Sequence, residues 1–158
     1  MPQFEAGLYQ VSSLFLIPAL VLILAALVYA VFALGAFLVE SVQRRRAGWR
    51  SSLSRRQAQT DAASDDLELM ILKDLEGLRI VSRSAPMLGL VATMIPMGPA
   101  LLSLGRGDAS GVGQNMVVAF SGVTLALIAA SIAHYVLTVR RRWLLQDLRA
   151  IERAREAR

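Results

Sequence analysis

The chain has 158 residues, of which 55% are hydrophobic, and the 18% that are charged gather in a few blocks instead of spreading as in a soluble domain. Cysteine is absent, which excludes disulfides, thiolate metal sites and cysteine nucleophiles. The net charge is +5, but the arginines flank apolar segments, where they meet lipid headgroups, so we expect membrane lipid and no nucleic acid as a partner.

The first apolar segment, residues 14–39, contains no charged residue and is long enough to cross a hydrocarbon core of about 30 Å as a helix. At about 1.5 Å per residue it would measure roughly 39 Å, so we expect it to tilt or to protrude. Residues 1–13 lack the basic region of a signal peptide, and the segment is too long for the apolar part of one. We therefore predict a retained transmembrane helix.

Residues 40–84 form a polar connection, which is rich in arginine and serine up to about Thr60. Asp65 and Glu68 then have capping-box spacing and predict a helix N-terminus. Beyond them an apolar side chain recurs every three or four positions, at Leu67, Ile71, Leu75 and Leu78. This stripe predicts an amphipathic helix that packs on a neighbouring helix beneath the membrane.

The second apolar segment, residues 85–104, contains prolines well inside it. A proline within a helix frees a backbone carbonyl and usually bends the helix, so we expect a kink at Pro96 and Pro99. Residues 105–115 are rich in glycine and predict a tight polar turn. The third apolar segment, residues 116–139, follows this turn, so the second and third segments should form a helical hairpin.

Lysine and arginine are concentrated in residues 40–84 and in the tail, residues 140–158, whereas residues 1–13 contain none and residues 105–115 contain a single arginine. The positive-inside rule therefore places the connection and the tail in the cytoplasm, and the N-terminus and the turn outside. The sequence predicts an all-α integral membrane protein with three transmembrane helices and cytoplasmic helical extensions. Its expected location is the cell (inner) membrane, as a multi-pass protein.

An enzyme needs convergent acid, base or nucleophilic groups, and the three apolar segments contain no Asp, Glu, Lys or Arg and a single His. We expect no catalytic residue, no metal site and no cofactor. Glu40 and Asp108 lie at the ends of segments and are interpreted as interfacial charges. His134, near the inner end of the third segment, is a candidate proton exit because imidazole can accept and release a proton. The alternative is a neutral histidine that bonds between helices or faces cytoplasmic water.

The remaining polar side chains of the second and third segments are mainly hydroxyls, at Thr93, Ser103, Ser121, Thr124, Ser131 and Thr138. The four in the third segment fall near one face of the helix because they are spaced by three or seven residues. Such a face can order water, or hydrogen-bond a carboxyl group from a partner, at a lower cost than burying a fixed charge. It can equally join helices, since serine and threonine commonly do so in membranes.

Small residues recur at every fourth position of the third segment, at Gly122, Ala126 and Ala130. This spacing lets helix backbones approach closely in a membrane and predicts dense packing. Three such helices cannot enclose a path alone, so we expect a homo-oligomer.

Two stretches of the second and third apolar segments carry recognisable motifs. Residues 84–97 read S-A-P-M-L-G-L-V-A-T-M-I-P-M, which is similar to the pattern A-P-x-L-G-L-L-G-T-V-x-G-M. Residues 119–127 read A-F-S-G-V-T-L-A-L, which is similar to the pattern A-L-x-x-T-A-x-G-L. These patterns are those of the second and third spans of the MotA/TolQ/ExbB proton-channel family, which the chain resembles by motif over residues 84–142 and by layout over the remainder. It implies a homopentamer around a dimer of single-span ExbD- or MotB-like subunits, whose membrane aspartate carries the proton.

Carried over to this chain, the resemblance makes Thr93 the pore-facing threonine of the second span. In the third span Val123 occupies the threonine column and Thr124 follows one residue later, which turns the side chain by about 100° around the helix. Either Ser121 or Thr124 would therefore complete the proton path. The chain would then be the pore-lining subunit of a proton-driven motor or energy-transducing complex.

Two other readings compete with the proton path. The first is a non-conducting structural scaffold of the same architecture, favoured by Val123 and by Ala92, which stands where the family has glycine. The second is a small transporter, which is disfavoured because no buried charge or polar cluster marks a substrate site.

Overall fold

The structure, a computed structural model of the chain, describes residues 7, 10–11, 13–44 and 64–156. Most of residues 1–13 and the arginine-rich residues 45–63 of the predicted connection lie outside the described residues. The described part contains three long helices, which are α2 (Leu16–Arg44), α4 (Ser64–Gly105) and α5 (Ala109–Glu156). Each is long and apolar enough to cross a membrane, so the predicted all-α class with three membrane-length helices is confirmed.

The structure joins elements that the sequence separates. The linker helix and the second apolar segment form one helix, because α4 continues unbroken from Ser64 through Pro86, Pro96 and Pro99 to Gly105. Similarly, α5 joins the third apolar segment to the basic tail. Its 48 residues would measure roughly 72 Å at about 1.5 Å per residue, more than twice the hydrocarbon thickness of a membrane. In a helix that crosses a membrane once, this length would leave a large part outside the lipid.

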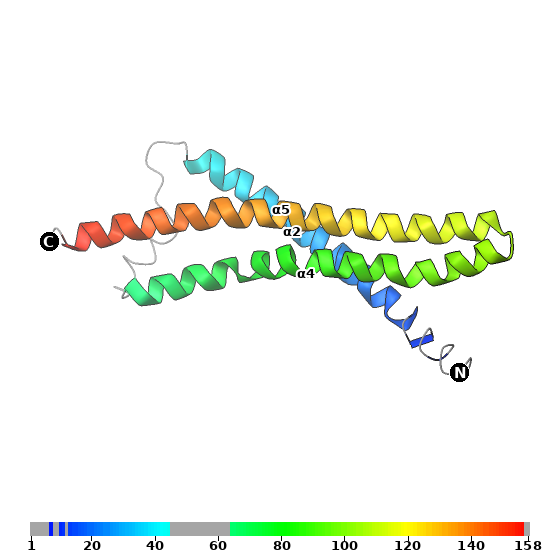
Figure 1. The fold of residues 1–158 in the computed structure, drawn as a ribbon. Coiled ribbons are helices and arrows are strands. Elements are labelled where there is room, and N and C mark those ends of the chain that lie inside the picture. The colour runs from blue at the N-terminus through cyan, green and yellow to red at the C-terminus, as the bar shows by residue number, and fades with distance from the viewer. Residues whose placement is uncertain (1–6, 8–9, 12, 45–63, 157–158) are drawn as a thin grey trace.

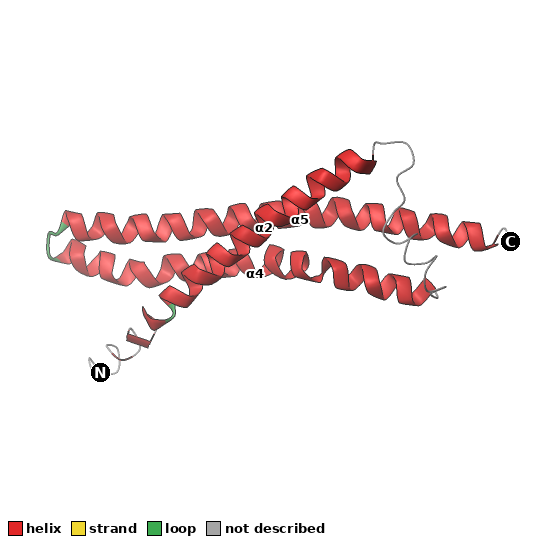
Figure 2. Cartoon of the chain, turned by 180° about the vertical axis from the view of Figure 1, so that it is seen from behind, coloured by secondary structure: helices red, strands yellow, loops and turns green. Residues whose placement is uncertain are grey.

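The helices α4 and α5 form an antiparallel hairpin and lie side by side along their length (Figure 1). The helix α2 crosses obliquely over one face of this hairpin, the face turned toward the viewer in Figure 2. The opposite face, turned toward the viewer in Figure 1, is not covered by any described helix. We call this surface the open face of the hairpin.

The turn between α4 and α5 depends on Gly107 and Asp108. Gly107 has a φ of 72°, in the left-handed region that glycine adopts without the steric cost of a Cβ. Asp108 caps α5, because its Oδ1 accepts a hydrogen bond of 3.0 Å from the backbone N–H of Gly111. The carboxylate in the turn therefore has a structural partner.

Two apolar clusters hold the helices together. In the half of the hairpin far from the turn, the predicted stripe packs on large apolar residues of α5, and the α4 and α5 members of the cluster include Leu67, Ile71, Leu75, Leu78, Leu144, Leu148 and Ile151. The predicted packing of the stripe on a neighbouring helix is thus confirmed, and the neighbour is α5. Nearer the turn, a smaller cluster joins all three helices through Ile23, Ala92 and Ala126.

Candidate functional site

Close contact between small residues sets the register of α4 against α5. A Cβ added to Gly89 would lie 2.9 Å from the Cβ of Ala126. One added to Gly122 would lie 3.0 Å from the Cβ of Ala92 and 3.3 Å from Cδ2 of Leu20 in α2. All three helices therefore meet at Gly122, where a larger residue would force a neighbouring side chain or helix to shift. The other two small residues of the predicted packing face are also buried, namely Ala126 and Ala130.

This register brings the predicted path residues to one depth. Thr93 follows Ala92, and Ser121 precedes Gly122, so the Ala92–Gly122 contact places both at the same level of the hairpin. Thr124 lies about one turn further along α5.

The hydroxyl side chains of α5 face away from its packed side. Thr124 lies two residues from the buried Gly122 and Ala126, which is about 200° around a helix. The same spacing separates Ser131 from two buried alanines and Thr138 from a buried valine. All four hydroxyl residues of the third apolar segment are exposed in the single chain. This face therefore takes no part in holding the chain's own helices together.

Thr93 lies on the open face of α4. It is half-buried, and it stands eleven residues from Ser82 and fourteen from Arg79, close to three and four whole helical turns. All three side chains therefore share one side of α4. Ser82 and Arg79 border a groove between α4 and α5 that Thr138 of α5 also borders.

Of the two candidates in α5, Thr124 is the one that shares the open face with Thr93. Thr124 lies fourteen residues before Thr138, which is about 40° from it around the helix, whereas Ser121 lies seventeen residues before it, about 100° away. Ser121 and Thr124 together border a shallow hollow of about 460 Å³ on the outer flank of α5.

The threonine hydroxyls donate hydrogen bonds to their own helices. Thr93 Oγ1 donates to the carbonyl of Leu90, and Thr124 Oγ1 donates to the carbonyl of Phe120, both at 2.7 Å. Bonds of the same kind, each 2.8 Å long, are made by Ser131 and Thr138. A hydroxyl oxygen that donates its proton still has lone pairs, so each remains able to accept a hydrogen bond. A protonated carboxyl group could donate to this face without any fixed charge being buried.

The prolines of α4 add backbone acceptors near Thr93. Pro96 is buried and Pro99 is half-buried, and α4 remains helical through both. Since proline has no backbone N–H, Pro96 cannot donate to the carbonyl of Ala92, and Pro99 cannot donate to the carbonyl of Ile95. Thr93 lies between Ala92 and Ile95 along the chain.

His134 lies at the far end of the open face, one turn before Thr138. It is exposed and borders the groove between α4 and α5, which has a volume of about 630 Å³. The groove is basic, because it is bordered by Arg79, Arg83, Arg141 and Arg142. The candidate proton exit therefore opens among arginines rather than beside a carboxylate.

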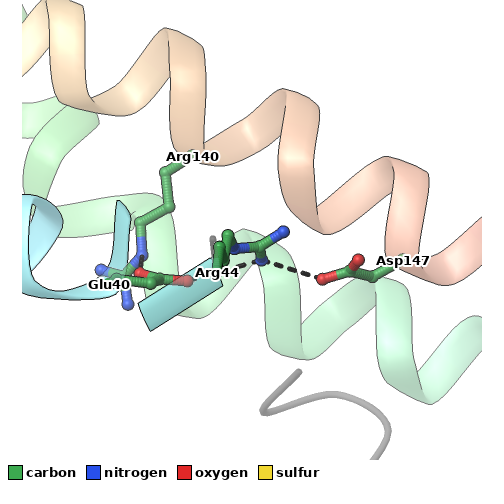
Figure 3. A network of polar contacts seen from close by, with 4 residues as sticks. All are labelled: Glu40, Arg44, Arg140 and Asp147. Atoms are coloured by element: carbon green, nitrogen blue, oxygen red, sulfur yellow. Dashed lines mark hydrogen bonds and ion pairs between the residues drawn. The ribbon is translucent and has the colours of Figure 1, made fainter. Parts of the chain in front are cut away.

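A polar network that the sequence analysis does not predict lies on the other side of the hairpin, at the end of α2 (Figure 3). Glu40 pairs with Arg44 at 3.5 Å and with Nε of Arg140 at 3.3 Å, and Arg44 pairs with Asp147 at 2.9 Å. The guanidinium of Arg44 also lies 4.7 Å from the ring centroid of Trp143. The spacing of Glu40 and Arg44 is a local signal for the first pair. No local signal predicts Asp147, which lies 103 residues from Arg44 along the chain.

The fold and this arrangement define an all-α protein with three membrane-length helices, the architecture of a multi-pass membrane protein. Comparison with models of known families, with curated proteins and with solved structures gives no match to this chain. Its function is therefore inferred from the geometry and the residue types of the hairpin, together with the two resembling stretches.

Proposed function

We propose that the chain is the pore-lining subunit of a proton-driven membrane complex of the MotA/TolQ/ExbB kind. The observation that carries this proposal is the open face of the hairpin, where Thr93 and Thr124 lie at similar depth, each with an oxygen that can accept a hydrogen bond. Ser131, Thr138 and His134 continue the polar side chains toward the basic groove. A row of polar groups that runs from the middle of an apolar segment to its charged end is suited to guide a proton.

The group that carries the proton would come from a partner. The three apolar segments of this chain contain no Asp, Glu, Lys or Arg, and proton relays through membranes use ionisable side chains. A single-span ExbD- or MotB-like subunit, as a dimer, would supply an aspartate at the depth of Thr93. When protonated, its carboxyl group would donate to the threonine oxygens; after a hydroxyl rotates, that hydroxyl could donate to the carboxylate.

The open face also supports assembly of several copies. In a single chain its hydroxyls would point toward lipid, whereas polar side chains in membranes normally face a bundle interior or a water-filled cavity. A ring of chains, five by the resemblance, would turn this face inward around the partner. In the orientation that the arginines favour, residues 40–84 and 140–158 lie in the cytoplasm and the N-terminus lies outside.

Replacing each threonine by valine tests the proton path. Thr93→Val and Thr124→Val keep the shape of the side chain and remove one hydroxyl, which costs about 1 kcal/mol or less of folding free energy. We expect both variants to assemble normally. Proton uptake by liposomes that contain the complex should fall about tenfold or more, because the partner's carboxyl group loses a hydrogen bond in a low-dielectric path. The complex is purified from its own membrane through a tag on this chain, so that the partner is retained.

Tyr29→Phe is the matched control. It removes a hydroxyl from α2, where Tyr29 packs against Gly77 of α4, and it should leave proton uptake unchanged. Native mass spectrometry establishes that each variant forms the same oligomer. Normal proton uptake by both threonine variants would contradict the path, and a stable monomer in both mild detergent and native lipid would contradict the ring.

A non-conducting scaffold is the second candidate, and one observation favours it. The hydroxyls of Thr93 and Thr124 already donate within their own helices, so neither needs a partner in order to be satisfied. In a scaffold, no single-span chain with a membrane carboxylate would co-purify. Both valine variants would then leave the process that the complex serves unchanged.

A further inference from the structure

The basic groove at the end of the open face concentrates positive charge without a matching carboxylate. Arg79 and Arg83 of α4 face Arg141 and Arg142 of α5 across it. In the part of the chain that the structure describes, no acidic residue borders the groove and none of the four arginines forms an ion pair. Glu68 borders only a smaller hollow that adjoins Arg79 and Arg141.

The two sides of the hairpin differ in how their arginines are compensated. On the α2 side, Arg44 and Arg140 pair with Glu40, and Arg44 also pairs with Asp147. On the open face the four groove arginines gather around one depression of about 630 Å³. Like charges held this close repel one another, so a bound anion would stabilise the groove.

The donors in the groove suit the oxygen atoms of a phosphate group. A guanidinium presents several N–H donors in a planar fork, which matches phosphate geometry and gives strong, charge-assisted hydrogen bonds. Because the arginines come from two helices, one phosphate could be held from both sides.

The surroundings of the groove favour a lipid as the source of that phosphate. The groove lies where the second and third apolar segments give way to arginine, the depth at which headgroups are found. Leu90 lies seven residues from Arg83, and Leu127 lies seven residues from His134, so each leucine stands about two turns from the groove on the same side of its helix. These leucines are 60% and 50% exposed. A basic site with exposed apolar side chains alongside fits a headgroup joined to acyl chains, which neither free phosphate nor an acidic peptide provides.

We propose that the groove between α4 and α5 binds the phosphate group of an anionic membrane lipid, whose acyl chains lie along Leu90 and Leu127. In the ring proposed above, the open face turns inward, so the lipid would lie inside the ring beside the partner's span. The inference does not depend on proton conduction, because a scaffold would present the same groove.

The test compares two double variants of the full chain that remove the same charge. Arg83→Gln with Arg142→Gln takes one arginine from each wall of the groove. Arg149→Gln with Arg153→Gln removes two exposed arginines of α5 that do not border it. Native mass spectrometry in mild detergent measures the binding of added phosphatidylglycerol and phosphatidylcholine. We expect the parent and the control to prefer phosphatidylglycerol, and the groove variant to bind it about 30-fold more weakly, or about fivefold for each lost arginine.

A third variant, Arg83→Lys with Arg142→Lys, keeps the charge and loses the planar fork, so it should bind phosphatidylglycerol more weakly than the parent and more tightly than the groove variant. Binding in this order separates loss of the site from loss of folding. Equal binding of phosphatidylglycerol by the groove and control variants would overturn the proposal, as would equal binding of both lipids by the parent. Binding of inorganic phosphate without binding of phosphatidylglycerol would overturn the lipid as its source. Loss of a bound protein partner from the groove variant, with lipid binding unchanged, would assign the groove to an acidic protein segment instead.

Discussion

The two halves of the α4–α5 hairpin are held together by different kinds of residue. Far from the turn, large side chains such as Leu78 and Leu144 fill the space between the helices. Nearer the turn the contacts are made by small residues, with Gly122 against Ala92 and Gly89 against Ala126. The difference follows from the solvent that each half would displace.

Burying a large apolar side chain stabilises a helix pair where the alternative is exposure to water. Lipid tails are as apolar as leucine, so in a membrane the gain comes instead from close backbone approach between small residues. The change of packing along one hairpin is therefore what a helix pair that passes from lipid into water requires. The change from small to large packing residues occurs near the arginines at the end of the apolar segments.

The largest loss of stability is expected from a cavity in the half with large side chains. Leu78 is 1% exposed and lies in the larger apolar cluster, so Leu78→Ala should lower the free energy of unfolding by about 2–5 kcal/mol. Unfolding of the purified chain in one fixed detergent measures the change. Leu69→Ala is the control, because Leu69 lies on the same helix and is exposed, and it should cost about 0.5 kcal/mol or less. An equal loss from both variants would remove the distinction between the two halves.

A smaller loss is expected when the close approach in the other half is blocked. Gly122→Leu would drive a side chain into Ala92 and Leu20, and overpacking of this kind costs about 1–3 kcal/mol. Gly35→Leu is the matched control, since a Cβ at Gly35 of α2 would meet nothing within 4 Å. Unfolding is followed in lipid bicelles, where close packing between helices, and not the hydrophobic effect, stabilises the helix pair. If the two leucine variants are equally stable, the small residues do not hold this half together.

Some of this arrangement is readable from the sequence, because it depends on local periodicity. The stripe of Leu67, Ile71, Leu75 and Leu78 predicts a packed face, and the structure buries all four. Its partner on α5 was missed, although the residues recur at the same helical spacing, at Leu144, Leu148 and Ile151. The arginines of the tail dominate its pattern, and the apolar side chains between them are the second signal.

The level of one helix against another could not be read in this way. Whether Thr93 lies opposite Ser121 or opposite Ser131 depends on which small residues touch, and every fourth residue in this part of α5 is small. Periodicity therefore leaves several registers open, and the Gly122–Ala92 contact selects one. The pairing of Glu40 with Arg140 is unreadable for the same reason, since Arg140 lies on another helix and is brought near only by the crossing of α2.

The smallest change is expected in the half far from the turn, where the Glu40 network joins α2 to α5. Asp147→Asn keeps the shape of the side chain and removes the charge that pairs with Arg44 at 2.9 Å. The side chains of Arg44 and Asp147 are 17% and 23% exposed, so solvent partly screens the pair, and Arg44 keeps Glu40 as a second partner. The loss should therefore be about 1 kcal/mol or less, as for other partly exposed ion pairs.

Since added salt screens such a pair, the loss should shrink further at high ionic strength, whereas the losses from Leu78→Ala and Gly122→Leu should not. Unfolding at low and at high salt checks this, with Asp74→Asn, an exposed carboxylate of α4, as the control. A loss as large as that of Leu78→Ala and independent of salt would show that the network fixes the position of α2, and that packing alone does not distinguish the two halves.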